Sequence, residues 1–410
     1  MPASPDSPSS ADATVYRREL IRPTLYRRMK WRVETVGFAV FEGLLGGLPL
    51  SWVARLGRGM GVVAYGCLAG RRKTVRRNLR IAFAGEKTPG ELDEIAAEVF
   101  RRSGANLLCS LCTARLSEAA LTEAVEVRDG AIFSEALARG KGVVMVLAHM
   151  GNWEALAQWF PRLLPQGVEG ATVYRPLNNP LMNARVAAQR RRLGIGLFSK
   201  DDNPLGMASF LRRGGVLGVL SDQRAGNIGE LVPFFGRVTS CTPIPAILAR
   251  RTGAAVVGIS LRSLAAGRWE LRFHASSEEP TTVGVMALLE RMMRESPADV
   301  FWLQDRWKIS LYEPHRQPGK KPRGGAVFPT KRRRALLWTE ASGKAPEPIA
   351  AEPADVDYEA GGALAGESVS DALRRIDEGM GLPLDYVVGG GALVRDACRE
   401  LGLGWMEGGA

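Results

Sequence analysis

A chain of 410 residues with 46% hydrophobic residues can bury a large core in one or two domains, which excludes a protein that is disordered throughout. Its formal net charge of +12 favours an anionic partner, such as nucleic acid, an anionic membrane surface or a phosphorylated substrate, although solubility alone also explains this charge. The five cysteines are odd in number and have no repeating spacing, which argues against a disulfide framework and fits a cytoplasmic, reducing environment.

The N-terminal part of the chain predicts a disordered start over residues 1–20 and membrane-associated helices over residues 21–80. The first segment is rich in Pro, Ser, Ala and Asp and lacks the apolar core of a signal peptide. Residues 33–70 are apolar and rich in glycine, with basic runs on either side, but charges and Pro49 interrupt them, so no uncharged stretch of about 18 residues exists. Two helices lying in a membrane interface fit this pattern, and so does an ordinary helical pair packed on the domain.

Residues 81–318 alternate between apolar runs and helical patterns, which predicts a catalytic domain of α/β class. Short, β-branched runs without alternation are typical of strands buried on both faces, and they occur at 142–148, 170–176, 214–223 and 254–261. Helices are expected at 91–114, 128–138, 154–164, 180–193, 204–213, 242–252 and 284–295. This order predicts a mostly parallel central sheet flanked by helices, and the alternating run 268–275 adds an antiparallel edge strand.

The composition changes after Gly319. Residues 319–368 are first basic and then acidic, with much Gly and Pro, and they predict a linker. Residues 369–410 predict a small helical tail with two short amphipathic helices, for which the sequence suggests no function.

A histidine ends the strand at 142–148, in the stretch HMGNWE. His149 falls at the carboxyl edge of the predicted sheet, where the sites of open parallel sheets gather. With Gly151 and Asn152 making a turn, Glu154 falls in the first turn of the next helix and can fold back onto the imidazole. One ring nitrogen would then be oriented by an acid while the other removes a proton. A helix-capping arrangement around a satisfied histidine is the alternative.

Other polar residues follow neighbouring strands. Tyr174 and Arg175 end one, where a guanidinium suits an oxyanion or a phosphate, or simply a surface salt bridge. Asp222, Gln223 and Arg224 end another. Beyond them, Phe234 and Phe235 could line an acyl channel or belong to the core, and the C-x-x-C pair Cys109 and Cys112 is more typical of helix packing than of a redox or metal site.

Missing motifs narrow the chemistry. The chain has no G-x-S-x-G elbow, P-loop, dinucleotide fingerprint or H-E-x-x-H, and its three histidines are far apart in sequence, so a zinc site is not expected. A general base without an enzyme nucleophile remains, so the substrate's own hydroxyl would attack a thioester.

At these residues the chain resembles the lysophospholipid acyltransferase superfamily, and within it the late (lauroyl/myristoyl) acyltransferases of lipid A biosynthesis. The resemblance rests on motifs in a fixed order between Thr24 and Pro314: RRKTVRRNLRIAF, HMGNWE, VYRPLNNP, SDQRAGNIGELVPFFG, CTPIPAILARRTGA and WLQDRWK. Gln304-Asp305 stands where close family members usually carry a histidine, and the acidic tail lies outside the pattern. Both departures leave the acceptor lipid open.

The resemblance implies an O-acyltransferase of acyltransferase-type α/β fold with N-terminal membrane-interface helices. It implies an acyl carrier protein or coenzyme A thioester as donor, no metal or other cofactor, and a place on the cytoplasmic face of the inner membrane. His149 would be the general base and Glu154 would orient it. The further roles would be oxyanion or phosphate binding by Arg175 and Arg224, support by Asn152, Tyr174, Asp222 and Gln223, and an acyl pocket of Trp153, Phe234 and Phe235.

Two other interpretations of the sequence remain, one for the acceptor and one for the function. The acceptor could be a lysophospholipid or another glycolipid rather than a lipid A precursor, since such enzymes share these motifs. A non-catalytic protein that binds membranes or nucleic acid through its arginine runs is the other alternative, but those runs are dispersed and lack interleaved aromatic residues.

Overall fold

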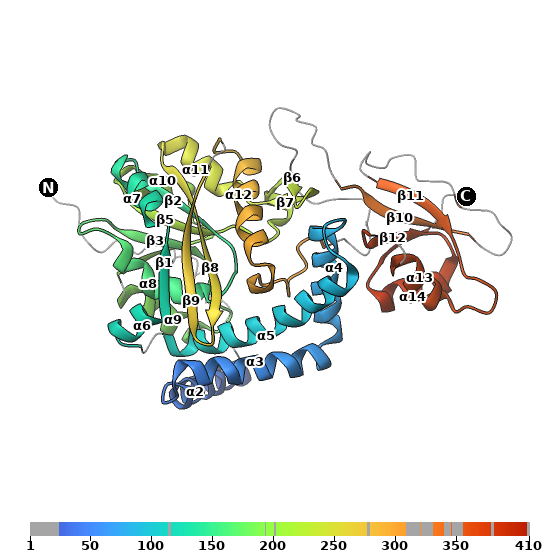
Figure 1. The fold of residues 1–410 in the computed structure, drawn as a ribbon, viewed down its shortest axis with the longest axis horizontal. Coiled ribbons are helices and arrows are strands. Elements are labelled where there is room, and N and C mark those ends of the chain that lie inside the picture. The colour runs from blue at the N-terminus through green and yellow to red at the C-terminus, as the bar shows by residue number, and fades with distance from the viewer. Residues whose placement is uncertain are drawn as a thin grey trace. The chain divides into compact units, whose positions relative to one another are not determined.

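The computed structural model describes residues 24–113, 116–192, 194–200, 202–276, 279–308, 320, 331–339, 346, 356–378 and 381–407 (Figure 1). Its chain forms two compact units. The first unit takes its residues from 1–66, 98–222 and 244–301, and the second from 67–97, 223–243 and 302–410. The predicted disordered start at 1–20 lies outside the described residues.

A seven-stranded sheet is the centre of the first unit, with the strand order β1-β9-β8-β2-β5-β3-β4. The strands are β1 (Val125–Arg128), β2 (Val143–Leu147), β3 (Gly170–Tyr174), β4 (Ile195–Ser199), β5 (Val216–Leu220), β8 (Ala255–Ala265) and β9 (Arg268–Ala275). β8, β2, β5, β3 and β4 are parallel to one another, whereas β9 runs antiparallel to β8. The predicted, mostly parallel sheet is therefore confirmed.

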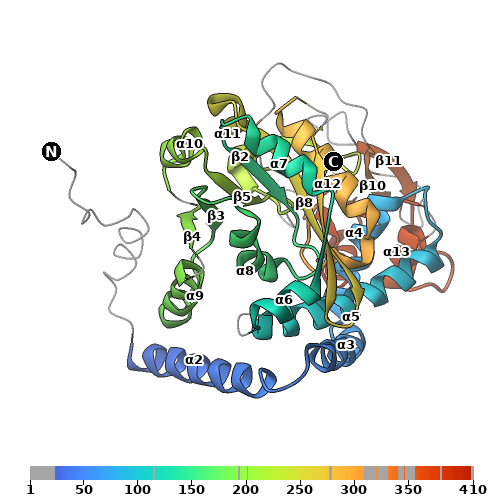
Figure 2. The same cartoon turned by 60° about the vertical axis from the view of Figure 1, so that its left-hand side comes forward.

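Helices flank this sheet, as the alternation in the sequence predicts (Figure 2). They are α6 (Glu118–Ala124), α7 (Gly130–Ala138), α8 (Trp153–Leu163), α9 (Pro180–Arg192), α10 (Pro204–Arg212), α11 (Ile244–Thr252) and α12 (Thr282–Glu295), with a short 3₁₀ turn at Pro297–Asp299. The core between them is apolar and includes Met145 of β2, Trp159 of α8 and Phe273 of β9. Burial of this apolar surface is the main driving force for forming the layers.

Two edges of the sheet differ from the prediction. The strand at 268–275 is antiparallel, but it is not the edge, because β1 pairs with it in parallel. At the other edge β4 is a strand that the sequence did not reveal. Both missed strands lack a strong signal: VEVR has two charges in four residues, and IGLFS contains a glycine.

The N-terminal helices are α2 (Leu25–Leu45), α3 (Leu50–Cys67) and the long α5 (Pro89–Thr113), whose residues from Glu98 onward belong to the first unit. α3 lies unusually close to α5. A Cβ atom on Gly57 would lie 2.5 Å from the carbonyl oxygen of Gly104, and one on Gly61 would lie 2.3 Å from that of Phe100. These glycines let the two backbones touch, so α3 is fixed by one face to the body of the unit.

The opposite faces of α2 and α3 expose large apolar side chains. Those on α2 are Leu25, Tyr26, Met29, Val33, Val36, Val40, Phe41 and Leu44, and those on α3 are Trp52, Leu56, Met60, Val62 and Val63. We call these thirteen side chains the apolar face. Among the described residues, no helix has the length and apolar composition needed to span a bilayer.

The second unit holds α4 (Ala69–Phe83), a hairpin of β6 (Glu230–Phe234) and β7 (Arg237–Cys241), a 3₁₀ turn at Gly226–Ile228, and a four-stranded parallel sheet. The order in that sheet is β11-β10-β12-β13, with β11 (Val356–Gly361), β10 (Arg333–Trp338), β12 (Leu384–Val388) and β13 (Gly404–Met406). Helices α13 (Val369–Glu378) and α14 (Gly391–Leu401) pack on it around Leu336, Leu373 and Val394.

The C-terminal region thus differs from a linker followed by a helical tail. Both predicted helices are present, but β10 and β11 lie within the segment predicted as a linker, and β12 and β13 within the predicted tail. Low-complexity sequence around RRALLW and VDYEAG hides these strands. The strands are anchored inside the second unit by Asp385, which is fully buried and accepts hydrogen bonds from Arg77 Nη2 (2.5 Å), from Arg237 and from the backbone N of Arg334 (3.0 Å).

Candidate active site

Two neighbouring parallel strands position the central pair of the site. β2 and β5 pair in a register that sets Leu147 opposite Leu220, and the Ser221 backbone N donates to Leu147 O (2.9 Å). His149 and Asp222 each follow two residues after these partners, at the carboxyl edge of the sheet. The register therefore brings an imidazole and a carboxylate from distant parts of the sequence to the same point.

His149 and Asp222 contact each other twice. The ring Nδ1 of His149 lies 2.7 Å from Asp222 Oδ1, and the backbone N of His149 donates to Asp222 Oδ2 (3.1 Å). Both side chains are largely buried, with 16% and 9% of their surface exposed. A carboxylate at Nδ1 holds the proton on that nitrogen, which makes Nε2 the nitrogen that can take a proton from a substrate.

The pKa shifts of the pair agree in direction. Burial alone would lower the pKa of His149, but the charge of Asp222, its hydrogen bond and, more weakly, the charge of Glu154 raise that pKa above its usual value. Burial alone would raise the pKa of Asp222, but the charge of His149 and the hydrogen bonds from it lower that pKa. The site therefore stabilises an imidazolium next to a carboxylate.

The turn after His149 is fixed by the segment that follows α12. Phe301 N donates to His149 O (2.8 Å), and Gly151 N donates to Asp299 O (2.9 Å). Gly151 has a φ of 56°, and a Cβ atom there would lie 2.4 Å from Leu261 O, so only glycine fits this turn. The buried Asn152 caps α8, with its Oδ1 accepting from Ala155 N (3.2 Å).

Glu154 lies in the first turn of α8, as the sequence predicts. The hydrogen bond at Nδ1, however, is made by Asp222, to which the resemblance gave only a supporting role, and Glu154 acts on the pKa of His149 through its charge. The catalytic role of Glu154 stays a prediction. Trp153, next to it, has its ring centroid 5.2 Å from that of His149 and 5.5 Å from that of Phe301, so the imidazole lies against aromatic surface.

β3 brings two more of the predicted residues to the same edge, because it is the next strand after β5. Tyr174 ends β3, and its carbonyl oxygen accepts from Lys200 N (2.9 Å). Arg175 is exposed, and its side chain makes no hydrogen bond or ion pair with any residue that the structure describes. A cation is therefore available at this edge for an anionic group.

Gln223 and Arg224 belong to the second unit. There, Nη1 of Arg224 donates to the carbonyl oxygen of Lys308 (3.0 Å). The predicted parts of both residues in binding a substrate stay predictions.

Phe234 and Phe235 are fully buried in an aromatic cluster of the second unit. The ring of Phe234 stacks at 5.9 Å on Trp307, and that of Phe235 lies edge-on at 5.7 Å from Trp302 and from Phe83. The structure thus favours core packing over an acyl channel for these two residues.

Two residues inside the quoted motifs have structural roles that the sequence did not reveal. The buried guanidinium of Arg306 donates to Thr239 Oγ1 (3.1 Å) and Ser240 O (3.1 Å) and lies 4.8 Å from the ring centroid of Phe234. Asn78 Nδ2 donates to the carbonyl oxygens of Trp302 (2.9 Å) and Gln304 (2.7 Å). The segments RRKTVRRNLRIAF and WLQDRWK therefore help to hold the second unit together, a role that the sequence alone does not reveal.

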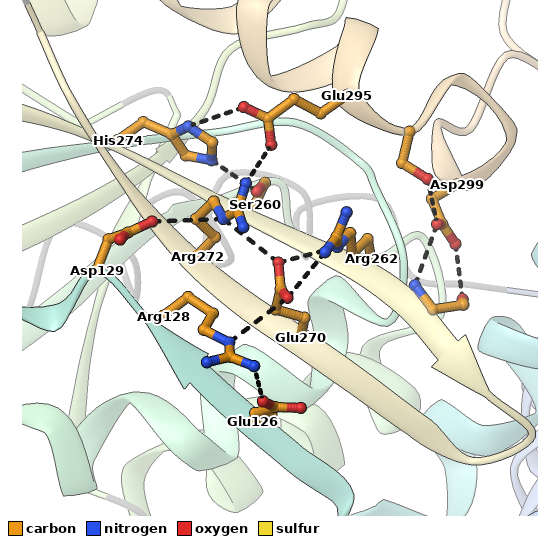
Figure 3. Close-up of polar contacts among 12 residues, drawn as sticks. Glu126, Arg128, Asp129, Ser260, Arg262, Glu270, Arg272, His274, Glu295 and Asp299 are labelled. Atoms are coloured by element: carbon orange, nitrogen blue, oxygen red, sulfur yellow. Dashed lines mark hydrogen bonds and ion pairs between the residues drawn. The ribbon is translucent and has the colours of Figure 1, made fainter.

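A second polar cluster lies in the first unit, around the buried Glu270 of β9 (Figure 3). Arg262, Arg272 and Arg128 surround the carboxylate of Glu270, at 2.9, 3.3 and 3.8 Å. In the same cluster, His274 Nε2 lies 2.8 Å from Ser260 Oγ and Nδ1 lies 3.6 Å from Glu295. This resembles a Ser-His-acid arrangement, but Ser260 is buried in the middle of β8 rather than at a strand end, so the cluster joins β1, β8, β9 and α12.

The cysteines of the C-x-x-C pair are buried in α5. Cys109 Sγ lies 3.8 Å from Leu50 O, and burial raises the pKa of its thiol to about 12, an effect to which Cys112 adds. A thiol this hard to ionise favours the packing interpretation over a redox or metal site. In the described part of the chain, no three His, Cys, Asp or Glu residues are grouped so that they could hold a metal ion.

The part of the chain that contains this site is similar to known proteins. The family model for bacterial lipid A biosynthesis acyltransferases matches residues 26–309. The lipid A biosynthesis lauroyltransferase of Escherichia coli (strain K12) is 26% identical over 271 residues, which cover 64% of this chain and 87% of that protein. The phosphatidylinositol mannoside acyltransferases of Mycobacterium tuberculosis (strain H37Rv) and Mycolicibacterium smegmatis are both 28% identical, over 44% and 48% of this chain and 59% and 66% of theirs.

Proposed function

Because the chain belongs to the bacterial lipid A biosynthesis acyltransferase family and is an acyltransferase, we propose that it moves a fatty acyl group from a thioester to a hydroxyl of a lipid A precursor or a related glycolipid. The observation that carries this proposal is the contact of His149 with Asp222 at the carboxyl edge of the sheet. Its support is that a buried, oriented imidazole is the general base that direct attack by an alcohol requires.

The proposed reaction needs no enzyme nucleophile. Nε2 of His149 removes the proton from the acceptor hydroxyl as its oxygen attacks the thioester carbonyl. The new C–O bond forms, the C–S bond breaks, and the imidazolium returns the proton to the departing thiolate. Asp222 stabilises the imidazolium in between, and the charge of Glu154 acts in the same direction. Arg175 would bind the oxyanion or a phosphate of one substrate.

The relatives' names support a glycolipid as the acceptor. One relative is named for lipid A and the others for a phosphatidylinositol mannoside, and both are phosphorylated glycolipids. A donor carried on acyl carrier protein or coenzyme A is anionic, so the formal net charge of +12 supports either. An acceptor outside this class, such as a lysophospholipid, is the second candidate. The sequence motifs are shared by enzymes that act on either kind of acceptor, so they also fit this candidate.

The apolar face of α2 and α3 supports a place on a membrane. Thirteen large apolar side chains in two neighbouring helices form far more exposed apolar surface than an isolated soluble domain needs. Basic residues Arg27, Arg28, Lys30 and Arg32 accompany them on α2, which suits anionic lipid headgroups. We place the enzyme on the cytoplasmic face of the inner membrane, lying in the interface through these helices.

An assay in vitro tests the proposal. Acyl carrier protein and coenzyme A thioesters are offered with a lipid A precursor, a phosphatidylinositol mannoside or a lysophospholipid, each in phospholipid vesicles. We expect transfer to a glycolipid, and a fall of about 10²–10⁴-fold in kcat for His149→Ala with an unchanged circular dichroism spectrum. Transfer to the lysophospholipid alone would show that the acceptor is a lysophospholipid and not a glycolipid. Near-normal turnover by His149→Ala would overturn the mechanism.

A further inference from the structure

Asn179 belongs to the loop that follows β3, and its side chain reaches α2. Residues 175–179 connect the end of β3 to α9, so this loop begins with Arg175 and ends with Asn179. Both α2 and this loop belong to the first unit. One side chain therefore joins the helix that carries the apolar face to the loop that carries the exposed cation of the site.

The amide of Asn179 makes two different sets of contacts. Its Oδ1 accepts from the backbone N of Leu181 (3.0 Å) and Met182 (3.3 Å), which caps the start of α9. Its Nδ2 donates to α2, where its acceptors are Trp31 O (3.1 Å), Glu34 Oε2 (3.0 Å) and Thr35 Oγ1 (3.4 Å). A cap needs only the oxygen, so the contacts of the nitrogen require another explanation.

α2 buries few of its residues, and several of its contacts with the rest of the unit are polar. Only Glu42 and Leu45 of its 21 residues are buried. Arg185 of α9 forms an ion pair with Glu42, which is a second polar connection between the same two helices. A helix with so little apolar packing on the protein side can change its position when its other side enters a lipid surface.

We propose that Asn179 is a positioning residue that couples the seating of α2 in a lipid surface to the placement of the Arg175 loop, an inference that rests on the proposed function. When the apolar face enters the interface, α2 is fixed, and the Nδ2 contacts fix the start of α9 and the loop before it. Arg175 then meets the anionic group of an acceptor that is embedded in the same surface. Soluble substrate analogues would not benefit from this coupling.

The chain offers a matched control for this inference. Asn203 also precedes a Pro-Leu pair, and its Oδ1 also accepts from the backbone N two residues on, Leu205 (3.0 Å). It caps α10, and no hydrogen bond joins it to α2 among the residues described here. Asn179→Asp and Asn203→Asp therefore add the same charge and keep the same capping oxygen. Only the first removes donors that point at α2, and it also sets a carboxylate against that of Glu34, so both effects loosen the connection to α2.

The experiment compares both variants with the wild type on mixed phosphatidylethanolamine and phosphatidylglycerol vesicles. In the wild type and in Asn203→Asp, we expect vesicles to slow hydrogen exchange of the amides at 177–183, and in Asn179→Asp we expect this response to be lost although the protein still floats with the vesicles. With acceptor in the vesicles, Asn179→Asp should raise KM about tenfold, the effect of losing roughly one to two net hydrogen bonds.

The outcomes separate this inference from the function on which it rests. If Asn179→Asp keeps the vesicle-induced protection, or if Asn203→Asp loses it equally, Asn179 is only a helix cap and the inference is wrong. If the wild type transfers no acyl group but shows the protection and Asn179→Asp does not, the proposed function fails while the coupling of α2 to the loop stands. If transfer occurs and KM is equal in all three proteins, the coupling has no part in acceptor binding.

Discussion

Asp222 holds His149 by two hydrogen bonds, one to the ring and one to the backbone. Because this carboxylate fixes both the backbone and the tautomer of the ring, its loss should impair catalysis directly. The charge of Asp222 also dominates the forces that raise the pKa of His149 against the effect of burial. The pH dependence of the reaction can therefore identify which acid serves the histidine.

We expect Asp222→Asn to lower kcat by about 10²–10⁴-fold and to move the acid limb of the pH–rate profile to lower pH. A base must be neutral, so in the wild type kcat/KM falls as pH drops through the raised pKa of His149. Without the charge of Asp222, burial dominates and that pKa drops. A profile of kcat/KM over about pH 5–9 measures the shift. A larger shift for Glu154→Gln than for Asp222→Asn would return the orienting role to Glu154.

The sequence places each of these residues correctly but does not reveal how they pair. His149, Tyr174 and Asp222 were each expected at a strand end, and the structure puts them there. The sequence suggests Glu154, five residues away, as the partner of the histidine, because strand order cannot be deduced from local patterns. The strand order β2-β5-β3 is needed to see that Asp222, at the end of β5, lies nearer to His149 than the end of β3 does. Proximity along the chain thus suggests Glu154, whereas the sheet brings Asp222 to the histidine.

Among the elements, the helix pair α3 and α5 shows how glycines let two helix backbones approach each other closely. The Cβ atoms absent at Gly57, Gly61 and Gly104 would each lie within 2.5 Å of a backbone oxygen of the facing helix. From the sequence, this region is recognisable only as rich in glycine, because spacing alone does not say which glycines face a neighbour. Gly59, on the same helix, has no atom within 4 Å of its missing Cβ.

This contrast gives a prediction at the scale of the element. Gly61→Ala should lower stability by about 1–3 kcal/mol, because the added methyl group meets the backbone of Phe100 and the helices must separate. Gly59→Ala should be neutral or raise stability by up to about 1 kcal/mol, because alanine favours a helix. Urea unfolding midpoints measure both. Equal midpoints for the two variants would mean that α3 and α5 do not pack at this distance.

At the scale of the whole molecule, the matched family region and the structural units do not coincide. The family match ends at residue 309, yet the second unit combines α4 and the β6-β7 hairpin from inside that region with strands from beyond it. The parallel strand β12 is joined to both inner elements through Asp385. The C-terminal strands are therefore part of the folded second unit rather than an appended tail.

Asp385→Ala tests this integration. The substitution would leave Arg77 and Arg237 charged but without their shared carboxylate, and the side chain of Arg237 is only 3% exposed. Removing one partner of a buried ion pair lowers stability by about 3–5 kcal/mol. Burial alone would raise the pKa of Asp385, but the two guanidiniums lower it, so the pair is charged at neutral pH.

Hydrogen exchange of the β12 amides in the full-length protein measures the loss. We expect these amides, and those of α4 and β7 together with them, to exchange faster in Asp385→Ala by a factor that corresponds to that free energy. Asp396→Ala is the control, because Asp396 is 61% exposed and, within the described part of the chain, forms an ion pair only with Arg395. If β12 alone lost protection while α4 and β7 kept theirs, the C-terminal strands would be a separate domain, since cooperative opening of all three elements is what a shared buried carboxylate requires.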